Sequence, residues 1–182
     1  MEIEGKKILL LGGWGLVGSA VANEVMKYSP REIIMSSLRQ SEAEQAVANL
    51  EKEFPNSSTK FKPEWGNIFV RKEWKDEDFN KVLDNAADRQ AFISDIFMEL
   101  DDKILRNSSL YSMIVEHNTD IIIDCINTAT GIAYMDIYST TAKALKQMET
   151  GEIEEGLAEK IIASTYIPQL IRHIQILNKA LN

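Results

Sequence analysis

The glycine-rich stretch from Lys6 to Tyr28, KKILLLGGWGLVGSAVANEVMKY, constrains the fold of this chain more than any other. It begins with a short continuous run of apolar residues that ends in glycine, a pattern typical of a strand buried on both faces. From Leu16 onward, apolar residues recur at helical spacing as far as Tyr28, and Pro30 follows shortly after. The stretch therefore predicts a strand, a glycine-rich turn and a helix, in that order.

A second unit of the same kind follows directly. Residues 31–37, REIIMSS, predict a second strand, and residues 41–54, SEAEQAVANLEKEF, predict a second helix. Ser41 precedes Glu44 by three residues, which is the spacing of a capping box at a helix start. Two consecutive strand-helix units of this kind are typical of a parallel sheet with covering helices.

Two further strands and a long helical stretch complete the predicted fold. A third strand is expected within residues 58–74, ending near Asn67, and residues 119–127, TDIIIDCIN, predict a fourth strand rich in β-branched residues. Between them, residues 76–118 are acidic and helical in pattern, and they predict a helical insertion. The predicted fold class is α/β: a Rossmann-like, doubly wound parallel sheet that is incomplete, with about four strands and a helical insertion after the third strand.

Composition limits the classes of protein to which the chain can belong. A length of 182 residues with 45% hydrophobic content suits one domain, residues 1–182, with a core of its own. The formal net charge of -8 disfavours nucleic acid and anionic membrane as partners. Cys125 is the only cysteine and no apolar run approaches the ~20 residues of a membrane span, so we expect a soluble, cytoplasmic protein.

The glycines of the first turn carry the chemical information. Gly13, Gly15 and Gly18 satisfy G-x-G-x-x-G, and Gly12, Gly15 and Gly18 satisfy G-x-x-G-x-x-G. Such a turn allows a tight bend, lets backbone N–H groups approach a pyrophosphate and brings the helix close to the strand. The helix N-terminus adds partial positive charge where the anion lies. Dinucleotide binding is the favoured interpretation, and a purely structural turn is the alternative.

We expect the whole turn to contact the cofactor. Trp14 is expected to line the cofactor channel, with an indole packed on the protein surface as the alternative. The predicted cofactor-binding residues of the turn are Gly12, Gly13, Trp14, Gly15, Leu16, Val17 and Gly18.

The end of the second predicted strand bears on the choice of cofactor. An acidic residue there accepts hydrogen bonds from the adenosine ribose, whereas a basic residue suits a 2′-phosphate. Ser36, Ser37 and Arg39 occupy this region, and the sequence indicates no carboxylate beside them, because Glu32 is expected to begin the strand. We therefore expect NADP in preference to NAD, the alternative being that Arg39 is merely a solvated residue at a helix start.

With these motifs in place, the chain resembles the short-chain dehydrogenase/reductase superfamily, in particular its extended, epimerase/dehydratase-like branch. LLLGGWGLVGSAV is similar to the opening of that family, WGNIF to its motif after the third strand, and DCINTATGIAY to its loop after the fourth strand. The resemblance implies cofactor contacts in the two later motifs at Asn67, Ile68, Asn127, Thr128 and Ala129.

The catalytic pattern of the family is not matched. The resemblance implies proton transfer by a Tyr whose phenol is made more acidic by a Lys four residues later, but Tyr138 and Lys143 are five residues apart. We therefore expect the chain to be the N-terminal cofactor-binding portion of a longer reductase or epimerase-like enzyme, inactive alone. The alternatives are a non-catalytic NAD(P)-sensing module that acts through protein partners, and a saccharopine-dehydrogenase-like reductase.

Two further expectations concern partners and metals. The strand order three, two, one, four would leave an apolar edge on the fourth strand, which favours a homo-oligomer through that edge. His117 and His173 are expected in a loop and on a helix surface, without a cluster of ligands, so no metal site is predicted.

Overall fold

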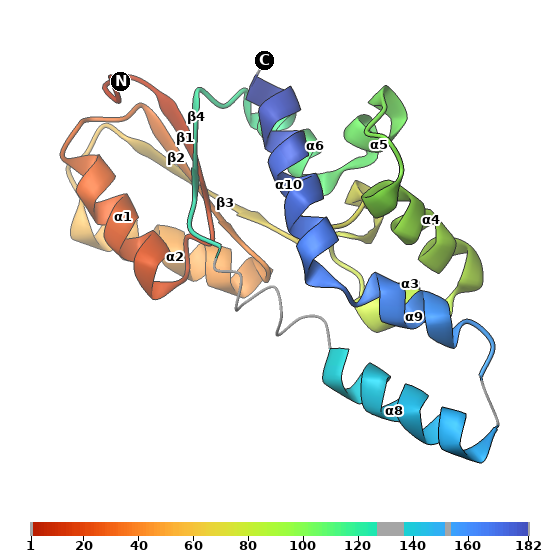
Figure 1. Cartoon of the computed structure of the whole chain (residues 1–182). Helices are drawn as coiled ribbons and strands as arrows, with labels where there is room; N and C mark the ends of the chain where they lie inside the picture. Colours follow the sequence, from red (N-terminus) through yellow and green to blue (C-terminus); the bar gives the residue numbers. More distant parts are fainter. Residues whose placement is uncertain (1, 127–136, 152–153, 182) are drawn as a thin grey trace. The chain divides into compact units, whose positions relative to one another are not determined.

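The fold is α/β and contains a four-stranded parallel sheet in the order β3-β2-β1-β4 (Figure 1), as the sequence predicts. The computed structural model of the chain describes residues 2–126, 137–151 and 154–181. The four strands of the sheet are β1 (Lys7–Leu11), β2 (Glu32–Ser37), β3 (Lys60–Trp65) and β4 (Ile121–Asp124).

Helices connect the strands and follow the last one. The stretch between β3 and β4 is helical, as the sequence predicts for the insertion, and consists of one short 3₁₀ helix and four α-helices. The helices are α1 (Leu16–Met26), α2 (Gln40–Glu53), η1 (Lys72–Trp74), α3 (Phe79–Asp84), α4 (Ala86–Phe97), α5 (Asp102–Asn107), α6 (Ser109–His117), α8 (Ile137–Thr150), α9 (Leu157–Ala163) and α10 (Tyr166–Leu181).

The chain divides into two compact units. The sheet unit comprises the residues up to Ile68 together with Ser112–Ile126, and so holds all four strands, α1, α2 and most of α6. The helical unit comprises Phe69–Tyr111 and the described residues that follow the sheet unit, 137–151 and 154–181. Each unit is therefore assembled from two separate segments of the chain.

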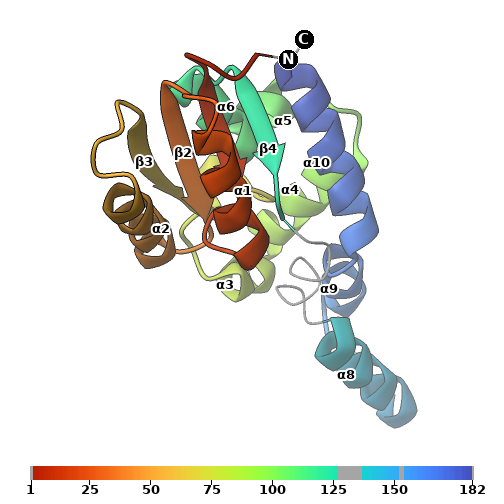
Figure 2. The same cartoon turned by 90° about the vertical axis from the view of Figure 1, so that its left-hand side faces the viewer.

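The sheet unit has helices on both faces of its sheet. Figure 2 shows α1 and α2 in front of the sheet and α6 behind it. The core beneath α1 and α2 is built on alternate strand residues, namely Ile8 and Leu10 of β1 and Ile33 and Met35 of β2. Intervening residues such as Leu9 are also fully buried. Burial on both faces explains why β1 and β2 are continuous apolar runs.

The ends of β3 and β4 differ by a few residues from the sequence-based prediction. β3 ends at Trp65, because Gly66 follows with a φ of +123°, a conformation that breaks an extended strand. β4 ends at Asp124, where the side chain turns back and its Oδ1 accepts a hydrogen bond from the N–H of Ile126 at 2.9 Å. Cys125 therefore lies just beyond the strand.

The predicted capping box at the start of α2 is wrong. The helix begins at Gln40, one residue before Ser41, so Ser41 and Glu44 lie inside it. Glu42 is the residue whose side chain folds back, and its Oε2 accepts the backbone N–H of Arg39 at 3.4 Å.

Neither histidine lies where the sequence-based prediction put it. His117 ends α6 instead of lying in a loop, and its Nε2 is 2.8 Å from Oε2 of Glu64. His173 is not on a helix surface, because only 5% of it is exposed and its ring packs against Phe69 with ring centroids 5.2 Å apart.

The helical unit has a core of its own. Its buried residues come from η1, α3, α4, α9 and the segment just before η1. They are Val70, Trp74, Val82, Phe92, Ile96 and Ala163. Arg89 of α4 is also buried, and its Nε donates a hydrogen bond to Oε2 of Glu159 on α9 at 2.8 Å. No helix in the described part of the chain is long and apolar enough to cross a membrane.

Candidate functional site

The glycine turn between β1 and α1 is closed by backbone hydrogen bonds. The N–H of Gly15 donates to the carbonyl of Gly12 at 3.1 Å, and the N–H of Gly13 donates to the carbonyl of Ser36 at 2.8 Å. The second bond ties the turn to the end of β2. The turn is therefore held between β1, β2 and α1 at the carboxyl end of the sheet, where ligands of open α/β sheets bind.

Two of the glycines are required by the chain itself. Gly12 has a φ of +76°, and a Cβ there would lie 3.2 Å from the carbonyl oxygen of Cys125. A Cβ on Gly18 would lie 2.2 Å from the carbonyl oxygen of Gly12 and 2.8 Å from the Cα of Gly13. Gly12 therefore forms the bend, and Gly18 allows α1 to pack closely against the turn.

The other two glycines are less constrained by their neighbours. A Cβ on Gly13 would meet the Cε of Met35 at 2.9 Å, but that atom ends a flexible side chain. Gly15 has ordinary backbone angles, φ -62° and ψ 162°. Among the described residues, a Cβ there would have only the carbonyl oxygen of Gly12 within 4 Å, at 3.3 Å. The space beside Gly15 is thus open to a ligand.

The start of α1 presents unpaired donors to this space. The first N–H groups of a helix have no partner within the helix, and at this N-terminus none of the described side chains caps them. The first turn also carries no acidic residue. Leu16 and Val17 are 90% and 62% exposed, and Trp14 is 44% exposed, so apolar side chains surround the donors. This arrangement fits an anion that carries apolar groups.

A carboxylate that the sequence-based prediction missed lies beside the end of β2, on α2. The Oγ of Ser37 donates a hydrogen bond to Oε2 of Glu42 at 2.7 Å, and Nη1 of Arg39 lies 3.5 Å from Oε1. The prediction that no carboxylate accompanies Ser37 and Arg39 is therefore wrong. The signal that could have found Glu42 is its place as third residue of α2, from which a Glu folds back over the helix start.

The side chains around Glu42 differ in accessibility. Ser36 is 2% exposed, so its hydroxyl is buried. Ser36 takes part in the site through its backbone carbonyl, which accepts the hydrogen bond from Gly13. The Arg39 side chain is 74% exposed and that of Glu42 is 24% exposed. Arg39 is thus the group most free to reach a ligand.

The motif after β3 comes close to the same edge of the sheet. The N–H of Gly66 donates to the carbonyl of Ser37 at 3.1 Å, which brings the segment that holds Asn67 beside the end of β2. Asn67 is half-buried. Ile68 is 5% exposed, so its side chain belongs to the core. The predicted residues Asn127, Thr128 and Ala129 lie outside the described residues.

Other chemistry is limited in the described part of the chain. Burial, with a smaller contribution from Asp124, raises the pKa of the Cys125 thiol, which keeps it protonated and unreactive. Lys143 forms an ion pair with Glu154. Among the described residues, no group of three or more His, Cys, Asp or Glu side chains could hold a metal ion.

A comparison of the chain with protein-family models found no match, and a search of curated proteins found none either.

Proposed function

We propose that the glycine turn binds the pyrophosphate of a dinucleotide, with NADP preferred over NAD. The chain would then be the cofactor-binding part of a short-chain dehydrogenase/reductase or an epimerase/dehydratase-like enzyme. The resemblance of the turn and of the WGNIF motif to that superfamily supports the choice of family.

The observation that carries the proposal is that the three glycines of G-x-x-G-x-x-G are needed for different reasons. Gly12 is needed for its backbone angle and Gly18 for close packing of the helix. Neither reason applies to Gly15, which has ordinary angles and mostly open space where a side chain would be. In dinucleotide-binding turns, the middle glycine lets the backbone approach the pyrophosphate, and that role is the one left for Gly15.

The proposed preference for NADP rests on Arg39. Its guanidinium is largely exposed, whereas Glu42 is held back by hydrogen bonds from the Ser37 hydroxyl and the Arg39 N–H. An exposed guanidinium next to the ribose site suits a 2′-phosphate, which it can bind through paired N–H groups. Glu42 reduces this preference, because its negative charge lies near the same phosphate.

A second candidate function is a non-catalytic module that senses NAD(P) through the same turn and acts on protein partners. One observation favours it: none of the five tyrosines in the chain has a lysine four residues later. Both candidates require the cofactor to bind.

The experiment that tests the proposal is calorimetric titration with NADPH and with NADH. We expect Gly15→Asp to weaken NADPH binding at least 100-fold, about 3 kcal/mol, because it places a side chain and a negative charge beside the pyrophosphate. Ala48→Asp is the matched control, since Ala48 is exposed on α2 and the change adds the same charge away from the turn. Absence of binding by the folded wild-type chain would contradict the proposal and leave the glycines a structural role alone.

A further inference from the structure

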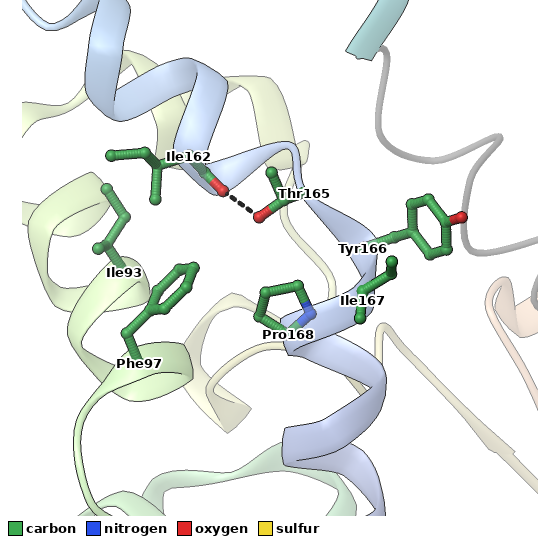
Figure 3. A pocket seen from close by; sticks show the side chains of 7 residues that line it. All are labelled: Ile93, Phe97, Ile162, Thr165, Tyr166, Ile167 and Pro168. Atoms are coloured by element: carbon green, nitrogen blue, oxygen red, sulfur yellow. Dashed lines mark hydrogen bonds between the residues drawn. The ribbon is translucent and has the colours of Figure 1, made fainter.

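An apolar pocket lies within the helical unit. It has a volume of about 720 Å³, and its lining comes from α4, from the end of α9 and from the start of α10. Figure 3 shows Ile93 and Phe97 of α4 facing Ile162 and Pro168 across the space. Every residue that lines the pocket belongs to the helical unit, so the pocket is separate from the glycine turn, which belongs to the sheet unit.

Hydrogen bonds from two buried residues of α10 hold the walls of the pocket in place. The Nε2 of Gln169 donates to the carbonyl of Ala163 at 3.1 Å, which fixes the corner between α9 and α10. The Nη2 of Arg172 donates to the carbonyl of Ile96 at 3.1 Å and also to that of Met98. These two carbonyls flank Phe97, so Arg172 ties α10 to the end of α4. The pocket is therefore built into the fold, as most small-molecule sites are.

The lining presents carbon atoms to a ligand and little else. The hydroxyl of Thr165 donates to the carbonyl of Ile162 at 2.6 Å. In Figure 3 the ring of Tyr166 extends away from Ile93 and Phe97, which carries its hydroxyl out of the space. The lining residues, all in the described part of the chain, include no charged side chain. A carboxylate or phosphate group would therefore lose its hydration in the pocket without gaining a partner.

The extent of the lining favours a compact ligand over a docked helix. α4 contributes Ile93 and Phe97, which are one helical turn apart, and α10 contributes only its first three residues. A helix that docks in a groove is held by anchors spread over about two turns. The volume of the pocket, in contrast, lies within the range of roughly 300–1,000 Å³ that small-molecule sites occupy. It is about five times that of a ~150 Å³ apolar cavity that binds benzene.

We infer that this pocket binds an uncharged, mainly aliphatic small molecule. Removal of apolar surface from water drives the binding, because isoleucine and proline side chains form most of the walls. The formal net charge of -8 adds a general repulsion against anionic ligands. The inference does not depend on the proposed dinucleotide site, since the two sites share no residue.

The first test uses the uncharged fluorescent probe phenylnaphthylamine, whose emission rises in apolar surroundings. Titration of the full chain should give a signal that saturates at one probe per chain, and decanol should displace the probe. Decanoate, which has the same chain length and a negative charge, should displace it about tenfold less well, because its carboxylate finds no partner. Equal displacement by decanol and decanoate would overturn the inference, as would the absence of saturable binding by the folded wild-type chain.

The second test locates the binding with a matched pair of variants on α10. Ile167→Glu places a charge in the lining, whereas Ile174→Glu makes the same change at a residue outside it. The two side chains are 58% and 61% exposed, so both variants should keep the melting temperature of the wild type. We expect Ile167→Glu to weaken decanol binding about tenfold or more and Ile174→Glu to leave it unchanged.

Two outcomes of the second test would contradict the inference. Equal losses in both variants would mean that decanol adsorbs to the exposed apolar face of α10 instead of entering the pocket. Decanol binding that weakens as the protein concentration is raised would mean that another protein chain covers the pocket. Loss in Ile167→Glu alone, at every protein concentration, is the result that the pocket requires.

Discussion

At the scale of single residues, Gly18 is the position where the turn tolerates a side chain least. A methyl group there would lie 2.2 Å from a backbone oxygen that cannot move without disturbing the turn. We predict that Gly18→Ala lowers the free energy of unfolding by about 2 kcal/mol, within the range for overpacked sites. The measurement is urea denaturation followed by circular dichroism.

The comparison with Gly13→Ala makes this prediction specific. The methyl group at residue 13 would meet the flexible end of the Met35 side chain, so the loss of stability should be well under that of Gly18→Ala. Equal losses for the two variants would mean that the close approach at Gly18 is not what constrains the turn.

Cofactor choice is also decided by single residues. We predict that Arg39→Gln reduces the ratio of NADPH affinity to NADH affinity about tenfold, because it removes the exposed cation expected to meet the 2′-phosphate. Glu42→Gln should move the ratio in the opposite direction, since it removes a negative charge beside the same group. Titration of both variants with both nucleotides measures these ratios. Unchanged ratios in both would place the ribose away from the end of β2.

A comparison of the glycines with Glu42 shows which parts of the site can be predicted from the sequence. The glycine pattern and the apolar run before it predict the turn, because backbone angles and close approaches leave a local signature. The carboxylate of Glu42 was missed because its position depends on where α2 begins. A shift of that start by one residue changes which side chain folds back to the end of β2.

At the scale of helices, α4 and α9 are joined by the pair of Arg89 and Glu159. The Arg89 side chain is 6% exposed and that of Glu159 is 34% exposed. We predict that Glu159→Gln lowers the free energy of unfolding, because it leaves a buried guanidinium without its counter-charge. Arg89→Met should lower it less, because water can solvate the remaining carboxylate. Urea denaturation would contradict this order if Arg89→Met were the more damaging change.

The pH dependence of the same pair supplies a control. The hydrogen bond from Arg89, followed by that from Gln90, lowers the pKa of Glu159 below its usual 4.5. A carboxyl with a lowered pKa in the folded state stabilises the fold above its unfolded pKa, and this stabilisation is lost as the pH falls through the folded pKa. The stability of the wild-type chain should therefore decline below pH 4.5 more steeply than that of Glu159→Gln.

Helix α10 shows why the sequence predicts elements better than their orientation. Its period of apolar residues is visible in the sequence, and the segment forms a helix. The usual assumption that the apolar face points inward fails here, because backbone carbonyls of Ala163, Ile96 and Met98 accept hydrogen bonds from the polar face. The acceptors at Ile96 and Met98 lie 76 and 74 residues from Arg172 along the chain, and they leave no trace in the period of α10.

At the scale of the whole molecule, each of the two units contains a hydrophobic cluster of its own. The core under α1 and α2 belongs to the sheet unit, the core around Phe92 belongs to the helical unit, and these two clusters share no residue. Because each unit is built from two chain segments, cutting the chain once would not release either intact. The units must therefore be compared within the full chain.

We predict that the two units lose structure independently, and native-state hydrogen exchange can measure this. Gly18→Ala should speed amide exchange in β1 and β2 and leave α4 and α9 nearly unchanged, because the methyl group strains only the sheet unit. Glu159→Gln should have the converse effect, and the double variant should add the two losses to within about 0.5 kcal/mol, as expected for sites that share no partner. Uniform acceleration across all four elements by either single variant would mean that the chain unfolds as one cooperative body, because strain in one core would then be shared by every amide.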